Sequence, residues 1–146
     1  RPSTVISFGQ GREREFNLET KALNLRDNRL DEEGNLPRNP LNSDMGPNEV
    51  FLETDVFELH GFLSERNFPV RISDDAGQYL CEETIYKLSE LQKASVELDR
   101  VFFCHVPPYG TSIEMAGHET EVNAVLLREY VRSVLSCLGI PVSKPN

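Results

Sequence analysis

The sequence has few cysteines, no excess of positive charge and no long hydrophobic run. Its 3 cysteines among 146 residues show no CxxC spacing, which argues against a disulfide framework or a zinc site and favours a reducing cytoplasm. It has 15 basic and 24 acidic residues. We therefore expect no nucleic-acid partner, because phosphate contacts need clustered Lys and Arg. The longest apolar runs, such as 101–104, are far too short to span a bilayer, so we expect no membrane insertion.

What is present resembles an ordinary globular chain. Hydrophobic residues make up 38% and charged residues 27%, proportions that allow a folded core within one domain of 146 residues. The first residues lack the apolar segment of a signal peptide, so we expect none. The sequence begins without Met and enters the apolar stretch 5–8 almost at once. We therefore expect a piece of a longer protein.

Hydrophobic spacing predicts helices that alternate with short strands. The expected strands cover residues 3–9, 16–24, 69–73 and 100–105. The expected helices cover residues 50–66, 78–94 and 119–139. Residues 25–48 are rich in Asn, Asp, Gly and Pro without a period, which predicts a long loop of the functional or disordered kind. The alternation in the second half indicates a single α/β domain over residues 1–146, with helices on both faces of a sheet.

Cys81 follows a predicted strand and the turn 74–77, near the start of a predicted helix. The positive end of a helix dipole favours a thiolate over a thiol, and free backbone N–H groups there can bind an oxyanion. Many cysteines are simply small buried apolar residues, and on position alone that interpretation is the more common one.

His105 ends a predicted strand before Val-Pro-Pro, at the edge where open α/β sheets place their sites. His60 lies in a helical pattern and His118 in a polar lead-in to the last helix, so we expect packing, capping or solvent roles for them. Cys104 and Cys137 are expected in the core.

A Cys–His pair can hydrolyse an acyl bond, because the base takes the thiol proton and later protonates the leaving amine. A third polar group must orient the imidazole. Glu19, an acid in an apolar-leaning strand, is a candidate, although a solvated edge residue is the simpler interpretation.

Three segments resemble the active-site segments of the type I pyroglutamyl peptidases, which remove an N-terminal pyroglutamyl residue from peptides. Residues 73–86 (SDDAGQYLCEETIY) and 101–108 (VFFCHVPP) put Cys81 on the nucleophile and His105 on the catalytic histidine. Residues 18–24 (LETKALN) resemble the family's Pro-Glu-Arg-x-Ala-x-Asn and put Glu19 on the catalytic acid. Three separated segments in the family's order are far more specific than one.

The resemblance implies a three-layer α/β/α sandwich with a mixed twisted sheet, of the phosphorylase/hydrolase kind. It implies that Cys81 attacks the pyroglutamyl carbonyl and that His105 acts as base and then acid, oriented by Glu19. It implies no metal or organic cofactor, and N-terminally pyroglutamylated peptides as partners. Its substrate and oxyanion positions fall on Arg29, Asn24 and Gly77.

The sequence departs from the family at several points. Thr20 replaces a usual Arg, and Glu82 stands where many members have Asn. Nothing matches the family's Gly-Phe-x-Pro-Phe-like loop, whose aromatic side chains help form the pyroglutamyl pocket, so the chain resembles an N-terminally truncated member.

Two other interpretations remain open. One is a non-catalytic α/β fragment or binding subunit that retains the scaffold. The other is an enzyme on a related scaffold, such as a nucleoside phosphorylase. Fast alkylation of Cys81 near pH 6, abolished by His105→Ala, would favour the peptidase over the fragment. The sequence leaves open whether the chain forms a homo-oligomer and which second residue it prefers.

Overall fold

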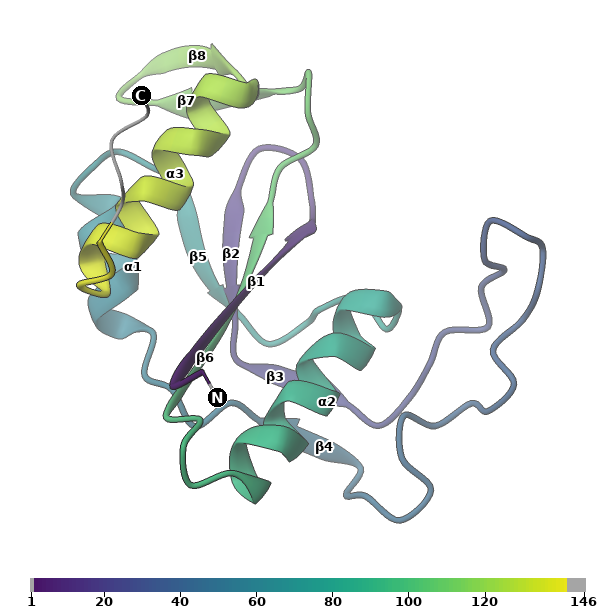
Figure 1. Ribbon diagram of the computed structural model, residues 1–146. Coiled ribbons are helices and arrows are strands. Elements are labelled where there is room, and N and C mark those ends of the chain that lie inside the picture. The colour runs from purple at the N-terminus through teal and green to yellow at the C-terminus, as the bar shows by residue number, and fades with distance from the viewer. Residues whose placement is uncertain (1, 142–146) are drawn as a thin grey trace. The chain divides into compact units, whose positions relative to one another are not determined.

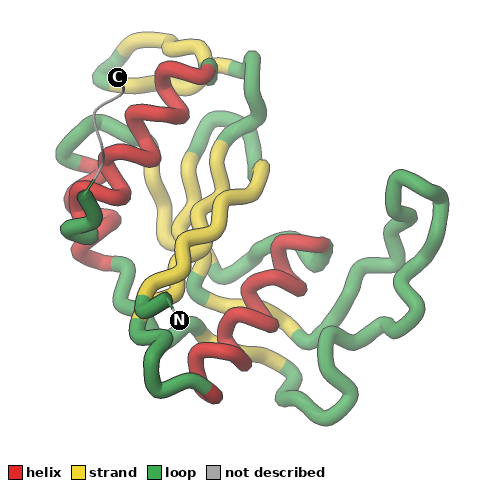
Figure 2. The backbone as a smooth tube through the Cα atoms, viewed as in Figure 1, coloured by secondary structure: helices red, strands yellow, loops and turns green. Residues whose placement is uncertain are grey.

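The computed structural model describes residues 2–141, and Figures 1 and 2 show their helices and strands. The strands are β1 (Thr4–Gln10), β2 (Phe16–Glu19), β3 (Lys21–Leu23), β4 (Glu49–Phe51), β5 (Val70–Ser73), β6 (Arg100–Val106), β7 (Ser112–Met115) and β8 (His118–Glu121). The helices are α1 (Phe57–Ser64), α2 (Leu80–Ala94) and α3 (Ala124–Cys137). The chain forms two compact units. Within the described range, unit 1 comprises residues 2–7, 19–54 and 73–103, and unit 2 comprises residues 8–18, 55–72 and 104–141.

The larger sheet has four strands in the order β1-β6-β2-β5, and it is mixed. Where β1 and β6 begin, the Arg100 N–H donates to the Ser3 carbonyl at 3.0 Å. Where they end, the Gly11 N–H donates to the Val106 carbonyl at 2.8 Å, so the two strands run parallel. Two antiparallel pairs complete the strands: β3 with β4, and β7 with β8.

In unit 1, helix α2 packs against β3 and β4, as Figure 1 shows. Ile85 and Tyr86 face this contact and are fully buried. The Tyr86 hydroxyl donates to the Pro47 carbonyl at 2.8 Å, which gives this buried polar atom a partner. The apolar cluster around them comprises Ala22, Val50, Leu52, Ala76, Leu98, Val101 and Phe103, with Val5, Cys81 and Leu88 packed against it.

In unit 2, helices α1 and α3 pack side by side (Figure 1). Tyr130 of α3 stacks on Phe16, with ring centroids 4.1 Å apart, and meets the edge of Phe68 at 5.3 Å. Helix α3 begins where the Asn123 side chain accepts hydrogen bonds from the N–H groups of Val125 (3.0 Å) and Leu126 (3.1 Å).

The structure corrects two predicted helices. Residues 50–66 contain β4 and the shorter α1, because residues 49–51 pair with β3 before the Asp55 carboxylate accepts the Phe57 N–H at 2.8 Å. Residues 119–139 begin with β8, and α3 starts only after the Asn123 cap. Predicted strand 16–24 divides into β2 and β3 on either side of Thr20. Residues 24–48 carry no helix or strand (Figure 2).

No helix of the described residues is long and apolar enough to cross a membrane.

Candidate functional site

Cys81 is the second residue of α2, close to where the sequence predicts a helix start. The thiol is half-buried and packs against the apolar cluster of unit 1. Tyr79 occupies the N-cap position without a side-chain hydrogen bond to the helix. The first turn therefore keeps backbone N–H groups available beside Cys81, at the positive end of the helix dipole. Such a position suits a nucleophilic thiol and an oxyanion.

The next residue, Glu82, is a buried carboxylate that sequence reasoning missed as a site element. One of its oxygens accepts the N–H of Leu23 at the end of β3, and the other accepts the Gln78 N–H at 3.0 Å. Glu82 thus ties the first turn of α2 to a strand and to the turn before the helix. Acidic residues are favoured in the first turn of a helix, and this preference could have pointed to Glu82 from the sequence.

The turn before α2 has a left-handed backbone at two consecutive residues. Gly77 has φ +86° and Gln78 has φ +55°. The Gly77 N–H donates to a carboxylate oxygen of Asp75 at 3.2 Å. Open space surrounds Gly77, so its backbone conformation, and not crowding, is what favours glycine there.

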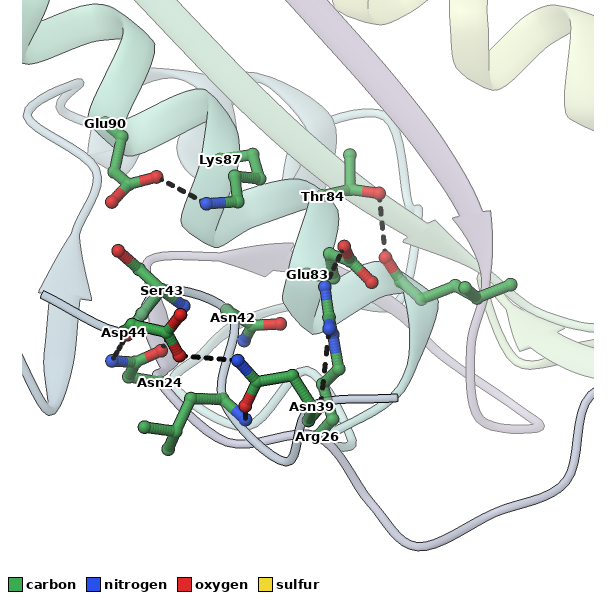
Figure 3. A network of polar contacts seen from close by, with 12 residues as sticks. Asn24, Arg26, Asn39, Asn42, Ser43, Asp44, Glu83, Thr84, Lys87 and Glu90 are labelled. Carbon is green, nitrogen blue, oxygen red and sulfur yellow. Dashed lines mark hydrogen bonds and ion pairs between the residues drawn. The ribbon is translucent and has the colours of Figure 1, made fainter. Parts of the chain in front are cut away.

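Two arginines attach the 24–48 loop to the first turn of α2. Arg29 lies 5.1 Å from the centroid of the Tyr79 ring and 3.3 Å from the Asp27 carboxylate. Arg26 pairs with Glu83 and donates to the Asn39 carbonyl at 3.3 Å, as the close-up in Figure 3 shows. The first of these arginines was predicted from the resemblance, and the second was missed.

Asn24 closes the same loop. Its amide nitrogen donates to the Ser43 carbonyl at 2.7 Å, and its amide oxygen accepts the Ser43 N–H at 2.8 Å (Figure 3). Asn42 adds a bond from its amide to the Leu23 carbonyl at 2.9 Å. These contacts tie the start of the loop to its residues 42 and 43, while a substrate role for Asn24 stays a prediction.

Glu19 and His105 lie in different units. Glu19 ends β2 within unit 1, with only 1% of its surface exposed. His105 lies in β6 within unit 2 and is 5% exposed. In that unit the turn after β1 runs directly over it, since a Cβ added to Gly11 would come within 2.6 Å of the His105 Cβ. Of the six predicted site residues, unit 1 holds Glu19, Asn24, Arg29, Gly77 and Cys81.

The other cysteines and histidines lie elsewhere. Cys104 is buried on β6, as predicted, whereas Cys137 is only half-buried on α3. His60 lies in α1 and His118 is exposed on β8. Among residues 2–141, no group of three or more His, Cys, Asp or Glu side chains could hold a metal ion.

Comparison with known proteins identifies the relatives of this chain. The profile of the pyroglutamyl peptidase family matches residues 1–140. The pyrrolidone-carboxylate peptidase of Finegoldia magna is 27% identical over 125 residues, which cover 84% of this chain and 59% of that protein. The Oceanobacillus iheyensis enzyme of the same name is 30% identical over 145 residues, covering 94% of this chain and 68% of that protein. The chain thus spans about six-tenths of the Finegoldia relative.

Solved structures share the fold. The crystal structure of pyrrolidone carboxyl peptidase from Fervidobacterium islandicum has a TM-score of 0.79 at 22% identity, covering 94% of this chain and 69% of that one. Pyroglutamyl peptidase I from Bacillus amyloliquefaciens has a TM-score of 0.79 at 19% identity, covering 99% of this chain and 70% of that one. The predicted α/β class with a mixed sheet is confirmed. This chain belongs to the pyroglutamyl peptidase family.

Proposed function

We propose that this chain takes part in hydrolysing the bond that follows an N-terminal pyroglutamyl residue of a peptide, by cysteine catalysis. The observation that carries the proposal is the half-buried thiol of Cys81 at the second residue of α2, in a chain that belongs to the pyroglutamyl peptidase family. Relatives that carry the name pyrrolidone-carboxylate peptidase support the same substrate class.

The proposed reaction has two stages. The His105 imidazole takes the thiol proton, and the Cys81 sulfur attacks the pyroglutamyl carbonyl carbon. The tetrahedral intermediate collapses to a thioester as His105 passes the proton to the leaving amine. Water, deprotonated by His105, then attacks the thioester, and the thiol leaves with the proton as free pyroglutamate forms.

The oxyanion of each tetrahedral intermediate needs hydrogen-bond donors. Backbone N–H groups in the first turn of α2 can supply them, since the Tyr79 side chain accepts no hydrogen bond from that turn. In the proposal Arg29, which lies over the ring of the N-cap residue Tyr79 and pairs with Asp27, supplies a positive charge near the helix start. In the proposal Glu19 orients the imidazole, and Gly77 and Asn24 shape the backbone around the substrate.

We further propose a cytoplasmic location and action on free N-terminally pyroglutamylated peptides. Three free cysteines within the described residues support a reducing compartment. Assembly of several copies stays a prediction that sedimentation of the purified chain would test.

The test is release of a fluorophore from a pyroglutamyl amide by the wild type and by Cys81→Ala. We expect the variant to lose at least about 10³-fold in kcat/KM, because the nucleophile cannot be replaced by binding alone. Cys137→Ala is the matched control and should keep full activity. The pKa of Cys137 is raised by burial and by nearby Glu58, so its thiol should react slowly.

Alkylation by iodoacetamide near pH 6 separates the remaining cases. Cys81 should react faster than Cys137, and His105→Ala should remove that difference. A fast Cys81 without amide hydrolysis would mean a competent nucleophile without a complete substrate pocket. If the chain neither hydrolyses the amide nor shows fast alkylation of Cys81, the proposal is contradicted. That outcome would favour a non-catalytic subunit.

A further inference from the structure

A pocket of about 340 Å³ opens in unit 1 between the 24–48 loop and the first turn of α2. Tyr79 and Leu80, the two residues before Cys81, form its helix side. Leu36 and Pro37 form its loop side. The proposed hydrolysis uses only Arg29 of this lining, and it assigns no role to the apolar part of the pocket.

Two pairs of the charged side chains around the pocket compensate each other. Its lining includes three arginines and three carboxylates. Arg26 is already paired with Glu83, and Arg29 lies 3.3 Å from Asp27 while it covers the Tyr79 ring. Besides these two pairs, the lining offers a ligand the apolar side chains of Leu36, Pro37 and Leu80, with Asp31 and Arg38 beside them.

Apolar side chains remain exposed in this lining. Leu80 is 61% exposed and Leu36 is 50% exposed, although each carries a large apolar group. Covering such surfaces with an apolar or aromatic side chain would remove them from water, which is favourable in proportion to the area covered. A charged side chain would gain little here, because it would have to compete with existing ion pairs.

The lining of the pocket includes Leu80, the residue directly before Cys81 on α2. An extended peptide advances about 3.3 Å per residue. Leu80 is the direct neighbour of Cys81, so the residue that follows the scissile bond can place its side chain beside Leu80 while the carbonyl carbon stays at the sulfur. We propose that this pocket binds an apolar or aromatic side chain of the leaving peptide, at the position directly after pyroglutamate. This inference rests on the proposed peptidase activity.

The test compares pyroglutamyl-phenylalaninamide with pyroglutamyl-glycinamide, which share the scissile bond and carry no free carboxylate. Released amine is measured with an amine-reactive dye. We expect kcat/KM to favour the phenylalanine substrate by about tenfold, the size of effect typical of one apolar side chain in a pocket. Leu36→Asp should bring the ratio near one while changing glycinamide turnover less than about twofold. Met45→Asp is the control, because Met45 is an exposed apolar residue of the same loop outside the pocket, and it should keep the wild-type ratio.

Equal turnover of both substrates, or a ratio unchanged by Leu36→Asp, would overturn the inference and leave the peptidase proposal standing. If neither substrate is cleaved, the peptidase proposal fails for this chain. A direct binding measurement then tests whether the pocket takes an aromatic side chain. Saturation-transfer NMR with phenylalaninamide should then give a signal for the wild type and Met45→Asp that Leu36→Asp loses. Equal signals for all three proteins, or none, would overturn the inference.

Discussion

The two units stabilise their interiors by different means. At the centre of unit 2, the Tyr130 ring is fully buried between aromatic rings, stacked on Phe16 and edge-on to Phe68. Burial raises the pKa of Tyr130 well above its ordinary value, with the neighbouring Cys104 thiol acting in the same direction. Unit 2 therefore depends at this point on close packing of large apolar surfaces.

Unit 1 depends much more on buried polar side chains that bond to the backbone. Ser89 donates to the Phe51 carbonyl at 3.1 Å, and Gln92 donates to the Asp99 carbonyl at 2.9 Å. Glu82 receives backbone N–H groups from two other segments. The backbone groups that these side chains meet lie where strands end or helices and strands begin: Leu23 ends β3, Phe51 ends β4, Asp99 precedes β6 and Gln78 precedes α2. Backbone groups at such places need partners outside the regular hydrogen-bond pattern. Unit 1, which holds the predicted nucleophile Cys81, is thus the unit in which buried polar side chains fix the backbone at the ends of helices and strands.

The largest expected effect comes from breaking the aromatic packing of unit 2. Phe16→Ala should lower the free energy of unfolding by about 3–5 kcal/mol, because it removes a fully buried ring and leaves a cavity beside Tyr130. Urea denaturation measures the change. The matched control is Phe57→Ala in the same unit, since Phe57 is 72% exposed and its loss should cost less than about 1 kcal/mol. If both variants lost the same free energy of unfolding, the claim that aromatic packing stabilises unit 2 would be wrong.

A smaller effect is expected from a polar contact of unit 1. Glu82→Gln keeps the shape but has one accepting oxygen, so the N–H of either Leu23 or Gln78 loses its partner. We expect a loss of about 1–3 kcal/mol in urea denaturation. Iodoacetamide should also react with Cys81 at a changed rate, because the first turn of α2 loses an anchor.

The control for this variant is Glu90→Gln on the same helix. Glu90 accepts from Lys87 at 2.8 Å, three residues away on the helix surface, and losing this pair should cost about 0.2–0.5 kcal/mol. If Glu82→Gln were as mild as Glu90→Gln and left the Cys81 rate unchanged, the polar half of the comparison would be wrong.

Regular elements with a strong local pattern could be predicted from the sequence. The strand that contains His105 and helix α2 were predicted because a buried apolar run and a helical apolar face are local features. The position of Cys81 near a helix start was confirmed for the same reason. Residues 49–51 were assigned to a helix because their pairing with β3 depends on a partner far away in the sequence. Most residues of the β7–β8 hairpin are polar and exposed, so its sequence shows no apolar alternation that would predict strands.

The contacts around the candidate site were harder to predict. The carboxylate of Glu82 reaches Leu23, and the guanidinium of Arg26 reaches Glu83, between segments separated by more than fifty residues of sequence. No local period marks such partners, because they depend on how the 24–48 loop returns to α2. The family resemblance predicts site roles for Arg29 and Gly77, which stay predictions, whereas the contacts of Arg26 and Glu82 came only from the structure.

The smallest expected effect lies in the β7–β8 hairpin of unit 2, where neither aromatic packing nor a buried polar contact operates. Glu114 and Glu119 are register partners in this antiparallel pair, and both are exposed. Like charges directly opposite each other are unfavourable, so Glu119→Gln should raise the free energy of unfolding by about 0.2–1 kcal/mol at low salt. The gain should shrink as salt screens the pair. Glu121→Gln is the control, because its register partner is the uncharged Ser112. A gain for Glu121→Gln as large as for Glu119→Gln would assign the effect to the net charge of the whole chain and not to this pair.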